Sequence, residues 1–82
     1  MNEQAVIIFT DEAKKIRSDL RVPLDITADE LVIALNSAFD LGIDIQDVKS
    51  CYLKAENPIV LLKGNRTLRE FGIRNGSVIR YS

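Results

Sequence analysis

The spacing of apolar and polar residues changes along this chain, and each change predicts an element of secondary structure. Residues 5–9 (AVIIF) form a continuous apolar run, which favours a strand covered by neighbours. Residues 16–22 then alternate between core-type and charged side chains, which predicts a strand with one buried face. The polar segment 11–15 predicts a hairpin connection between these strands. Pro23 is expected to end the second strand, because proline cannot donate to a ladder.

A longer period of three to four residues predicts one main helix. Thr27 and Glu30 stand at the spacing of a capping box, in which each side chain bonds the backbone amide of the other residue. Apolar residues then recur on one stripe that is expected to face a core. This stripe comprises Leu31, Ala34, Leu35, Ala38 and Leu41. Gly42 suits the left-handed conformation beyond a helix end, so we expect the helix over residues 28–41.

The second half of the chain predicts shorter elements. Residues 51–55 and 59–62 are predicted strands on either side of a turn at 56–58, and an irregular link anchored by Ile43 and Ile45 precedes them. Three closely spaced apolar residues, Leu68, Phe71 and Ile73, predict a short helical turn near 68–71. Asn75-Gly76 predicts a further turn, and residues 77–81 predict a closing strand.

These elements predict an α+β fold of the β-grasp type. The order is strand, strand, helix, strand, short strand, helical turn, strand. A mixed sheet of four to five strands packed on one helix is the compact solution for that order. With 82 residues, the chain is expected to form a single domain over 1–82 that buries roughly 60% of the unfolded surface.

Composition and charge exclude several classes of function. The net charge is -1 with acids and bases mixed along the chain, so there is no electrostatic footprint for nucleic acid. The sequence has no apolar run of transmembrane length and no signal-peptide pattern, so we expect a cytoplasmic protein without membrane insertion. The single cysteine, Cys51, cannot form an internal disulfide.

Candidate chemistry is sparse. The chain has no histidine, which removes Ser-His and Cys-His nucleophile pairs. The acids Asp40, Asp44 and Asp47 lack the glycine and the closing glutamate of a calcium loop, so they are expected to be solvated loop acids. Gly72 and Gly76 are turn glycines without a phosphate-binding lysine. We therefore expect no enzymatic activity, no metal and no cofactor.

The segment Arg66-Thr67-Leu68-x-Glu70-Phe71-x-Ile73, with its turn and final strand, resembles the last third of ubiquitin-like domains. The order of elements extends this resemblance over residues 5–82. Further motifs resemble the YukD/EsaB family of Gram-positive type VII (WXG-type) secretion systems. They are Asp19-Leu20-x-Val22-Pro23, Leu31-Val32-Ile33, Leu61-Leu62 and Gly72-Ile73-x-Asn75-Gly76.

The resemblance implies a cytoplasmic accessory or regulator of the secretion of small helical WXG-type substrates. It also implies relatives that are fused to the cytosolic end of a membrane component. Ubiquitin and the sulfur carriers need a flexible tail that ends in Gly-Gly, whereas this sequence closes with Arg80-Tyr81-Ser82. Conjugation to targets and sulfur transfer are therefore not expected.

The parity of the strands predicts a candidate contact surface. With Ala5, Ile7 and Phe9 toward the helix, the opposite, open face of the sheet receives alternate residues flanked by charged residues of the second strand. These residues are Val6, Ile8, Tyr52, Lys54, Val78 and Arg80, flanked by Arg17, Asp19 and Arg21. An apolar centre ringed by tyrosine and arginine is typical of a protein contact patch. The alternative, that basic side-chain stems cover strand-forming valines, stays open.

Val32, Ile33 and Phe39 fall off the main helical stripe and make a second candidate surface, although local packing against loops is the favoured explanation for them. Two classes of function remain. One is a non-catalytic interaction module of a type VII secretion apparatus, whose partner is a protein such as a membrane component or a second copy of the chain. The other is a ubiquitin-like scaffold or oligomerisation domain of a larger protein.

Overall fold

The first hairpin forms one half of the sheet. The structure, a computed structural model, describes residues 3–81, in which β1 (Gln4–Asp11) and β2 (Ile16–Pro23) pair antiparallel along their whole length. The connection has no Asn-Gly signature and closes in another way. The buried carboxylate of Asp11 accepts hydrogen bonds from the backbone amides of Ala13 and Lys14, at 3.0 and 3.4 Å. Lys15, with φ 56°, takes the left-handed position that glycine usually occupies in such a turn.

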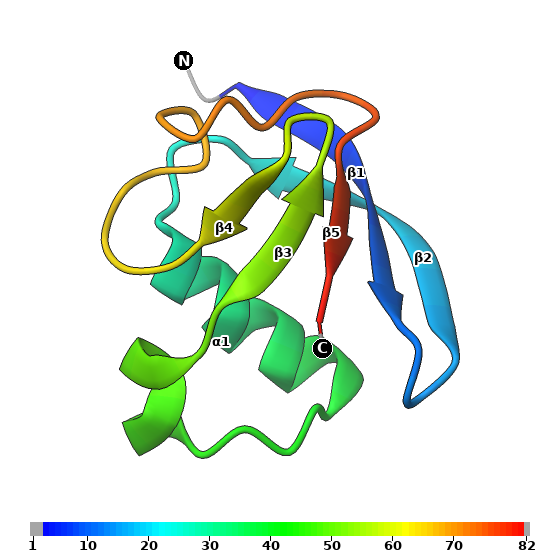
Figure 1. Cartoon of the computed structure of the whole chain (residues 1–82), viewed down its shortest axis with the longest axis vertical. Coiled ribbons are helices and arrows are strands. Elements are labelled where there is room, and N and C mark those ends of the chain that lie inside the picture. Colours follow the sequence, from blue (N-terminus) through cyan, green and yellow to red (C-terminus); the bar gives the residue numbers. More distant parts are fainter. Residues whose placement is uncertain (1–2, 82) are drawn as a thin grey trace.

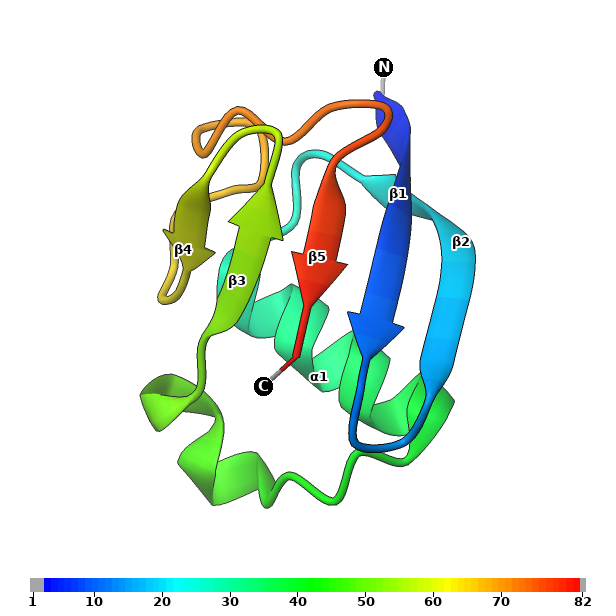
Figure 2. The ribbon, with the colours of Figure 1, turned by 45° about the vertical axis from the view of Figure 1, so that its right-hand side comes forward.

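The remaining strands complete a mixed sheet in the order β2-β1-β5-β3-β4 (Figures 1 and 2). β5 (Val78–Arg80) lies parallel to β1 and antiparallel to β3 (Leu53–Glu56), and β4 (Val60–Leu62) forms the outer edge beyond β3. The turn before β5 is held on β1, because the Val6 amide donates to the Asn75 side chain at 2.8 Å. The predicted architecture is confirmed, with five strands.

The main helix, α1 (Ala28–Phe39), begins as predicted. The Thr27 hydroxyl accepts from the Glu30 amide at 3.1 Å, and the Glu30 carboxylate accepts from the Thr27 amide at 2.9 Å. The next two amides of the helix, those of Ala28 and Asp29, donate to backbone carbonyls of the distant segment 64–66. The N-terminus of α1 is therefore completed by the second half of the chain.

The end of α1 differs from the prediction. The helix stops at Phe39, and Asp40 takes the left-handed cap, with φ 54°. Gly42 is left-handed as predicted, with φ 77°, but it lies two residues beyond the cap. Asp40 can take the cap because a short polar side chain tolerates this conformation. The Asn36 side chain then bonds both the amide and the carbonyl of Ile43, at 3.0 and 2.8 Å, and fixes the chain after the cap.

The buried face of α1 is rotated from the predicted stripe. Leu31 and Leu35 are in the core as expected, but Ala34 and Ala38 are exposed and Val32 is only 1% exposed. Burying a valine in place of an alanine removes more apolar surface from water. The predicted stripe treats alanine and valine as equally apolar, so it places the centre of the buried helix face at the wrong residues.

The link after α1 contains a short 3-10 helix, η1 (Ile45–Ser50), where an irregular segment was expected. Asp44 begins it by accepting from the Gln46 amide. Ile43 packs against the core as predicted, whereas Ile45 is 71% exposed and anchors nothing. Val48 is the buried residue of η1.

The predicted helical turn after β4 is present over residues 68–72, and Leu68 and Ile73 are buried beneath it.

Arg69 projects from this turn to the carboxylates of Glu3, at 2.6 Å, and Asp25, at 3.0 Å. These hydrogen bonds, that of Glu3 first, raise the pKa of Arg69. Hydrogen bonds from the backbone and side chain of Thr67 lower the pKa of Glu70.

The core lies between α1 and one face of the sheet, as the strand parity predicts. Ile7, Phe9 and Ile79 have no exposed surface, and Tyr81 packs against the same cluster. The Phe9 ring meets the Phe39 ring at a centroid distance of 5.1 Å. Ser82, which parity assigns to the open face, lies outside the described residues.

We expect Leu35→Ala to lower the free energy of unfolding by roughly 2–5 kcal/mol, because it leaves a cavity between α1 and the sheet. Ile33→Ala is the matched control on the same helix. Ile33 is 42% exposed, so its truncation should cost less than about 1 kcal/mol. Denaturant titrations of both variants measure the difference. Equal midpoints would show that Leu35 does not face the core.

A second prediction tests the register of β1. Ile7→Asp should unfold the protein, because it places a charge without a partner in the core. Ile8→Asp should leave the fold intact, since Ile8 lies on the open face next to solvent. Circular dichroism melts of the two variants distinguish these outcomes. Tolerance of Ile7→Asp together with unfolding of Ile8→Asp would shift the register by one residue.

Candidate functional site

The candidate site is the open face, the side of the sheet that α1 does not cover. In Figures 1 and 2, α1 lies behind the strands, and no other element covers their near side. The structure brings the predicted residues of this face together as alternate positions of β1, β3 and β5, with Tyr52 directly before β3. They are Val6, Ile8, Tyr52, Lys54, Val78 and Arg80.

The apolar centre of the open face is set by strand pairing. Ile8 lies opposite Val78 of β5 on one side and Asp19 of β2 on the other. Val6, one step along β1, is 42% exposed and lies opposite Arg21. Ile8 and Val78 are half-buried by their neighbours. Apolar side chains therefore occupy the middle of a face that could carry polar residues at no cost to the core.

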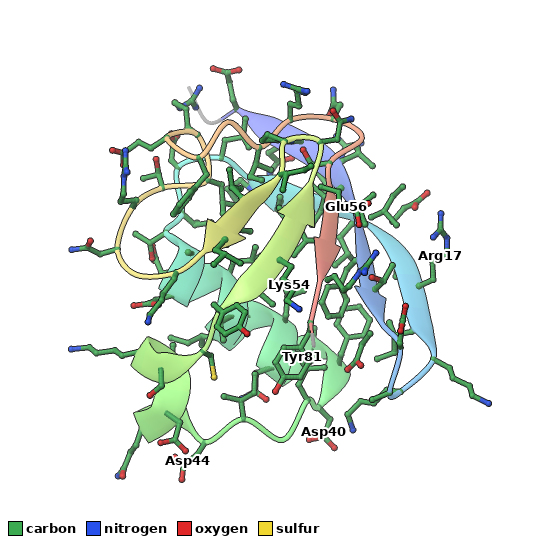
Figure 3. The ribbon with its side chains drawn as sticks, viewed as in Figure 1. Arg17, Asp40, Asp44, Lys54, Glu56 and Tyr81 are labelled. Carbon is green, nitrogen blue, oxygen red and sulfur yellow. The ribbon has the colours of Figure 1, made fainter. Side chains whose placement is uncertain are left out.

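A row of cations crosses the same face. Thr10 of β1 lies between Arg17 and Arg80, and Arg80 lies opposite Lys54 of β3. The Arg80 guanidinium is paired with the Glu56 carboxylate at 2.8 Å. Figure 3 shows Lys54 and Glu56 on the near side of the sheet and Arg17 at its β2 edge. The row thus carries three positive charges and one paired acid.

The structure adds Ile59 and Leu61 to the site, and neither was among the predicted residues. Leu61 of β4 lies opposite Lys54 and is 60% exposed, while Ile59, directly before the strand, is 88% exposed. Both line a shallow hollow over the β3–β4 hairpin, together with Lys54, Glu56 and Arg80. Successive residues of a strand point to opposite faces of the sheet, so the burial of Leu62 is enough to predict Leu61 on the open face.

A second hollow lies on the other side of the Arg80–Glu56 pair. Arg17, Lys15 and Val78 line it, with Arg80 and Glu56 shared between the two hollows. The ion pair therefore forms a ridge between two depressions, and the apolar residues lie on both sides of it. Such a surface offers hydrophobic contact together with charge-assisted hydrogen bonds.

The second candidate surface is not present as a surface. Val32 is 1% exposed, and Phe39 is half-buried against Phe9, so both belong to the core cluster. Ile33 alone of the three is on the exposed side of α1. Local packing against loops, the favoured explanation, is not what buries them: Val32 is part of the main core, and Phe39 packs on Phe9 of β1.

The other chemical candidates have local explanations. Asp44 caps η1, and Asp40 and Asp44 lie apart at the lower end of the molecule in Figure 3. Residues 3–81 contain no group of three acids, cysteines or histidines placed to hold a metal ion. Cys51 is a half-buried free thiol beside Tyr52 and Tyr81. None of the helices in the described part of the chain is long and apolar enough to cross a membrane.

Comparison with solved structures finds the ubiquitin-like fold. The ubiquitin-like domain of tubulin-binding cofactor B has a TM-score of 0.72 and 20% identity, over 98% of this chain and 89% of that one. A de novo designed protein based on ubiquitin reaches 0.69 at 18% identity, over 96% and 87%. The corresponding domain of Plasmodium falciparum Dsk2 reaches 0.62 at 16%, over 98% and 100%.

No relative among the curated proteins matches the chain. A family model does match, over residues 6–80, and it is described as "WXG100 protein secretion system (Wss), protein YukD". That range includes all seven elements of the structure except the first two residues of β1. The chain therefore belongs to the YukD family of the WXG100 protein secretion system.

Proposed function

We propose that this chain is a non-catalytic accessory component of a WXG100 secretion system, which acts in the cytoplasm as a single domain over residues 1–82. Its task is to bind another protein of the apparatus reversibly. The observation that carries this proposal is the uncovered apolar centre of the open face, Val6, Ile8 and Val78, on a member of the YukD family.

The composition of the open face supports a protein contact. Burial of its apolar side chains against a partner would gain about 25 cal/mol per Å² before the costs of association are subtracted. Arg80 and Tyr52 at the rim are of the residue types that dominate binding energy in interfaces. Ile59 and Leu61 extend the exposed apolar area toward β4. The alternative explanation, that the apolar residues of this face are only strand-forming valines, does not account for these two.

The charges of the open face indicate the kind of partner. Arg17, Arg21, Lys54 and Arg80 stand against two acids, Asp19 and Glu56, although the whole chain has a net charge of -1. An acidic surface with apolar residues fits this face, because complementary charge favours encounter and excludes like-charged proteins. The family assignment supports a protein of the same apparatus as the partner, and a membrane component is the one that we propose.

A second candidate function is a scaffold domain within a larger protein. It is favoured by the similarity of the fold to excised domains, such as the C-terminal ubiquitin-like domain of mouse tubulin-specific chaperone e, with a TM-score of 0.69 and 11% identity. The two functions differ in the partner. An interaction module of the secretion system binds components encoded with that system, whereas a scaffold domain does not depend on them.

The test is a pull-down from the native cytoplasm with the tagged protein, read by mass spectrometry. The wild type should capture a component of the secretion system, and Ile8→Asp should lose it while keeping its fold. Ile33→Asp is the matched control, because Ile33 is equally apolar and lies exposed on α1. Loss of the partner with Ile33→Asp but not with Ile8→Asp would place the site on α1 and refute the proposal.

The proposed contact is non-covalent, and the same experiment tests this. The captured partner should separate completely from the protein on a denaturing, reducing gel, also when the lysate is supplied with ATP. A heavier band that contains both chains and depends on ATP would show conjugation instead.

A further inference from the structure

β2 is a free edge strand that is as long as the central strand β1. It spans eight residues and lies outermost, beside β1 alone, whereas the opposite edge strand β4 has three residues (Figure 2). One side of the β2 backbone pairs with β1, and the other side faces none of the five described strands. An edge of this kind is a template for pairing with another strand.

The charged side chains of β2 have no partners within the part of the chain that the structure describes. Arg17, Asp19 and Arg21 are all exposed on the open face. Their cross-strand neighbours on β1 are uncharged: Thr10, Ile8 and Val6. Among residues 3–81, no hydrogen bond or ion pair involves these three side chains, whereas Arg66, Arg69 and Arg80 are all ion-paired.

We propose that β2 pairs antiparallel with β2 of a second copy of this chain, about a two-fold axis at Leu20. This register places Asp19 opposite Arg21 of the second copy, and the two-fold axis repeats the pair. It also places Leu20 opposite Leu20 of the second copy, on the side of the sheet that α1 covers. In the single chain this side chain is half-buried. Opposite charges on facing positions stabilise paired strands.

Charge selects this register over its neighbours. An axis at Asp19 would place Arg17 opposite Arg21 and Asp19 opposite itself, so every charged pair would repel. An axis at Ser18 would pair Arg17 with Asp19, but it would leave a shorter overlap and bring Arg21 opposite Lys15 of the turn. With the axis at Leu20, the overlap runs over residues 17–23 and ends at Pro23, where the strand itself ends.

The pairing has a structural consequence for the open face. Facing residues of two paired strands lie on the same side of a sheet. The two sheets would therefore join into one, with both open faces on one side and both copies of α1 on the other. A dimer of this kind presents two equal contact surfaces side by side, which increases the avidity for a repeated partner.

Charge reversal tests the pairing in solution. Asp19→Arg and Arg21→Asp should each weaken the self-association of the protein at least about tenfold, because each variant places like charges opposite each other twice. An equimolar mixture of the two variants should regain the dimer. In the mixed pair, arginines at 19 and 21 of one chain face aspartates at 21 and 19 of the other. Sedimentation velocity over a concentration series measures all of these states.

Two controls identify the surface. Arg17→Asp should dimerise as well as the wild type, because Arg17 faces Pro23 in this register. Ile8→Ala should also dimerise, since Ile8 lies on β1 and alanine adds no charge opposite Asp19. A loss of the dimer with Arg17→Asp but not with Arg21→Asp would place the axis elsewhere, and a loss with Ile8→Ala would place the contact on the open face. A wild type that stays monomeric up to about 1 mM would refute the pairing.

Discussion

The position of β1 in the centre of the sheet controls both faces of the molecule. β1 is hydrogen-bonded to β2 along its full length and to β5 on its other side. Its alternate residues Ala5, Ile7 and Phe9 form the floor of the core under α1. Because its apolar run is continuous, the residues between them are apolar too. β1 therefore contributes buried residues to the core and, on its other side, places the apolar residues Val6 and Ile8 on the open face.

Much of the fold could be predicted because its signals are local. The capping box at Thr27, the alternation of residues 16–22 and the end of β2 at Pro23 depend on neighbours within four residues, and the structure confirms them. Parity, once anchored on Ile7, also assigned six open-face residues to one side of three separate strands. Their use in binding stays a prediction, since strand geometry says where a side chain lies and not what it contacts.

The features that the sequence does not predict depend mostly on contacts beyond a single turn of helix or a single strand. Val32 is buried because the sheet and loops supply apolar surface at that side of α1, which a helical pattern alone does not show. Asp40 caps the helix because Asn36 holds the backbone of Ile43 behind it. Leu61 was overlooked for a different reason. Leu61 and Leu62 together resemble a motif of the family. Because they are neighbours in a strand, however, they lie on opposite faces of the sheet, with Leu62 buried and Leu61 exposed.

The amides at the start of α1 have a consequence for how the chain acquires its structure. Two of them donate to carbonyls of Arg66 and Gly64, at 3.0 Å each, and the Gly64 amide returns a bond to the Asp29 side chain at 3.1 Å. These partners are translated at least 35 residues after the amides that they bind. A nascent chain that has emerged only as far as η1 lacks them, and a helix of this length is marginal alone. The start of α1 is therefore fully hydrogen-bonded only after the loop at 64–66 has been made, so the second half of the chain helps to stabilise the helix of the first half.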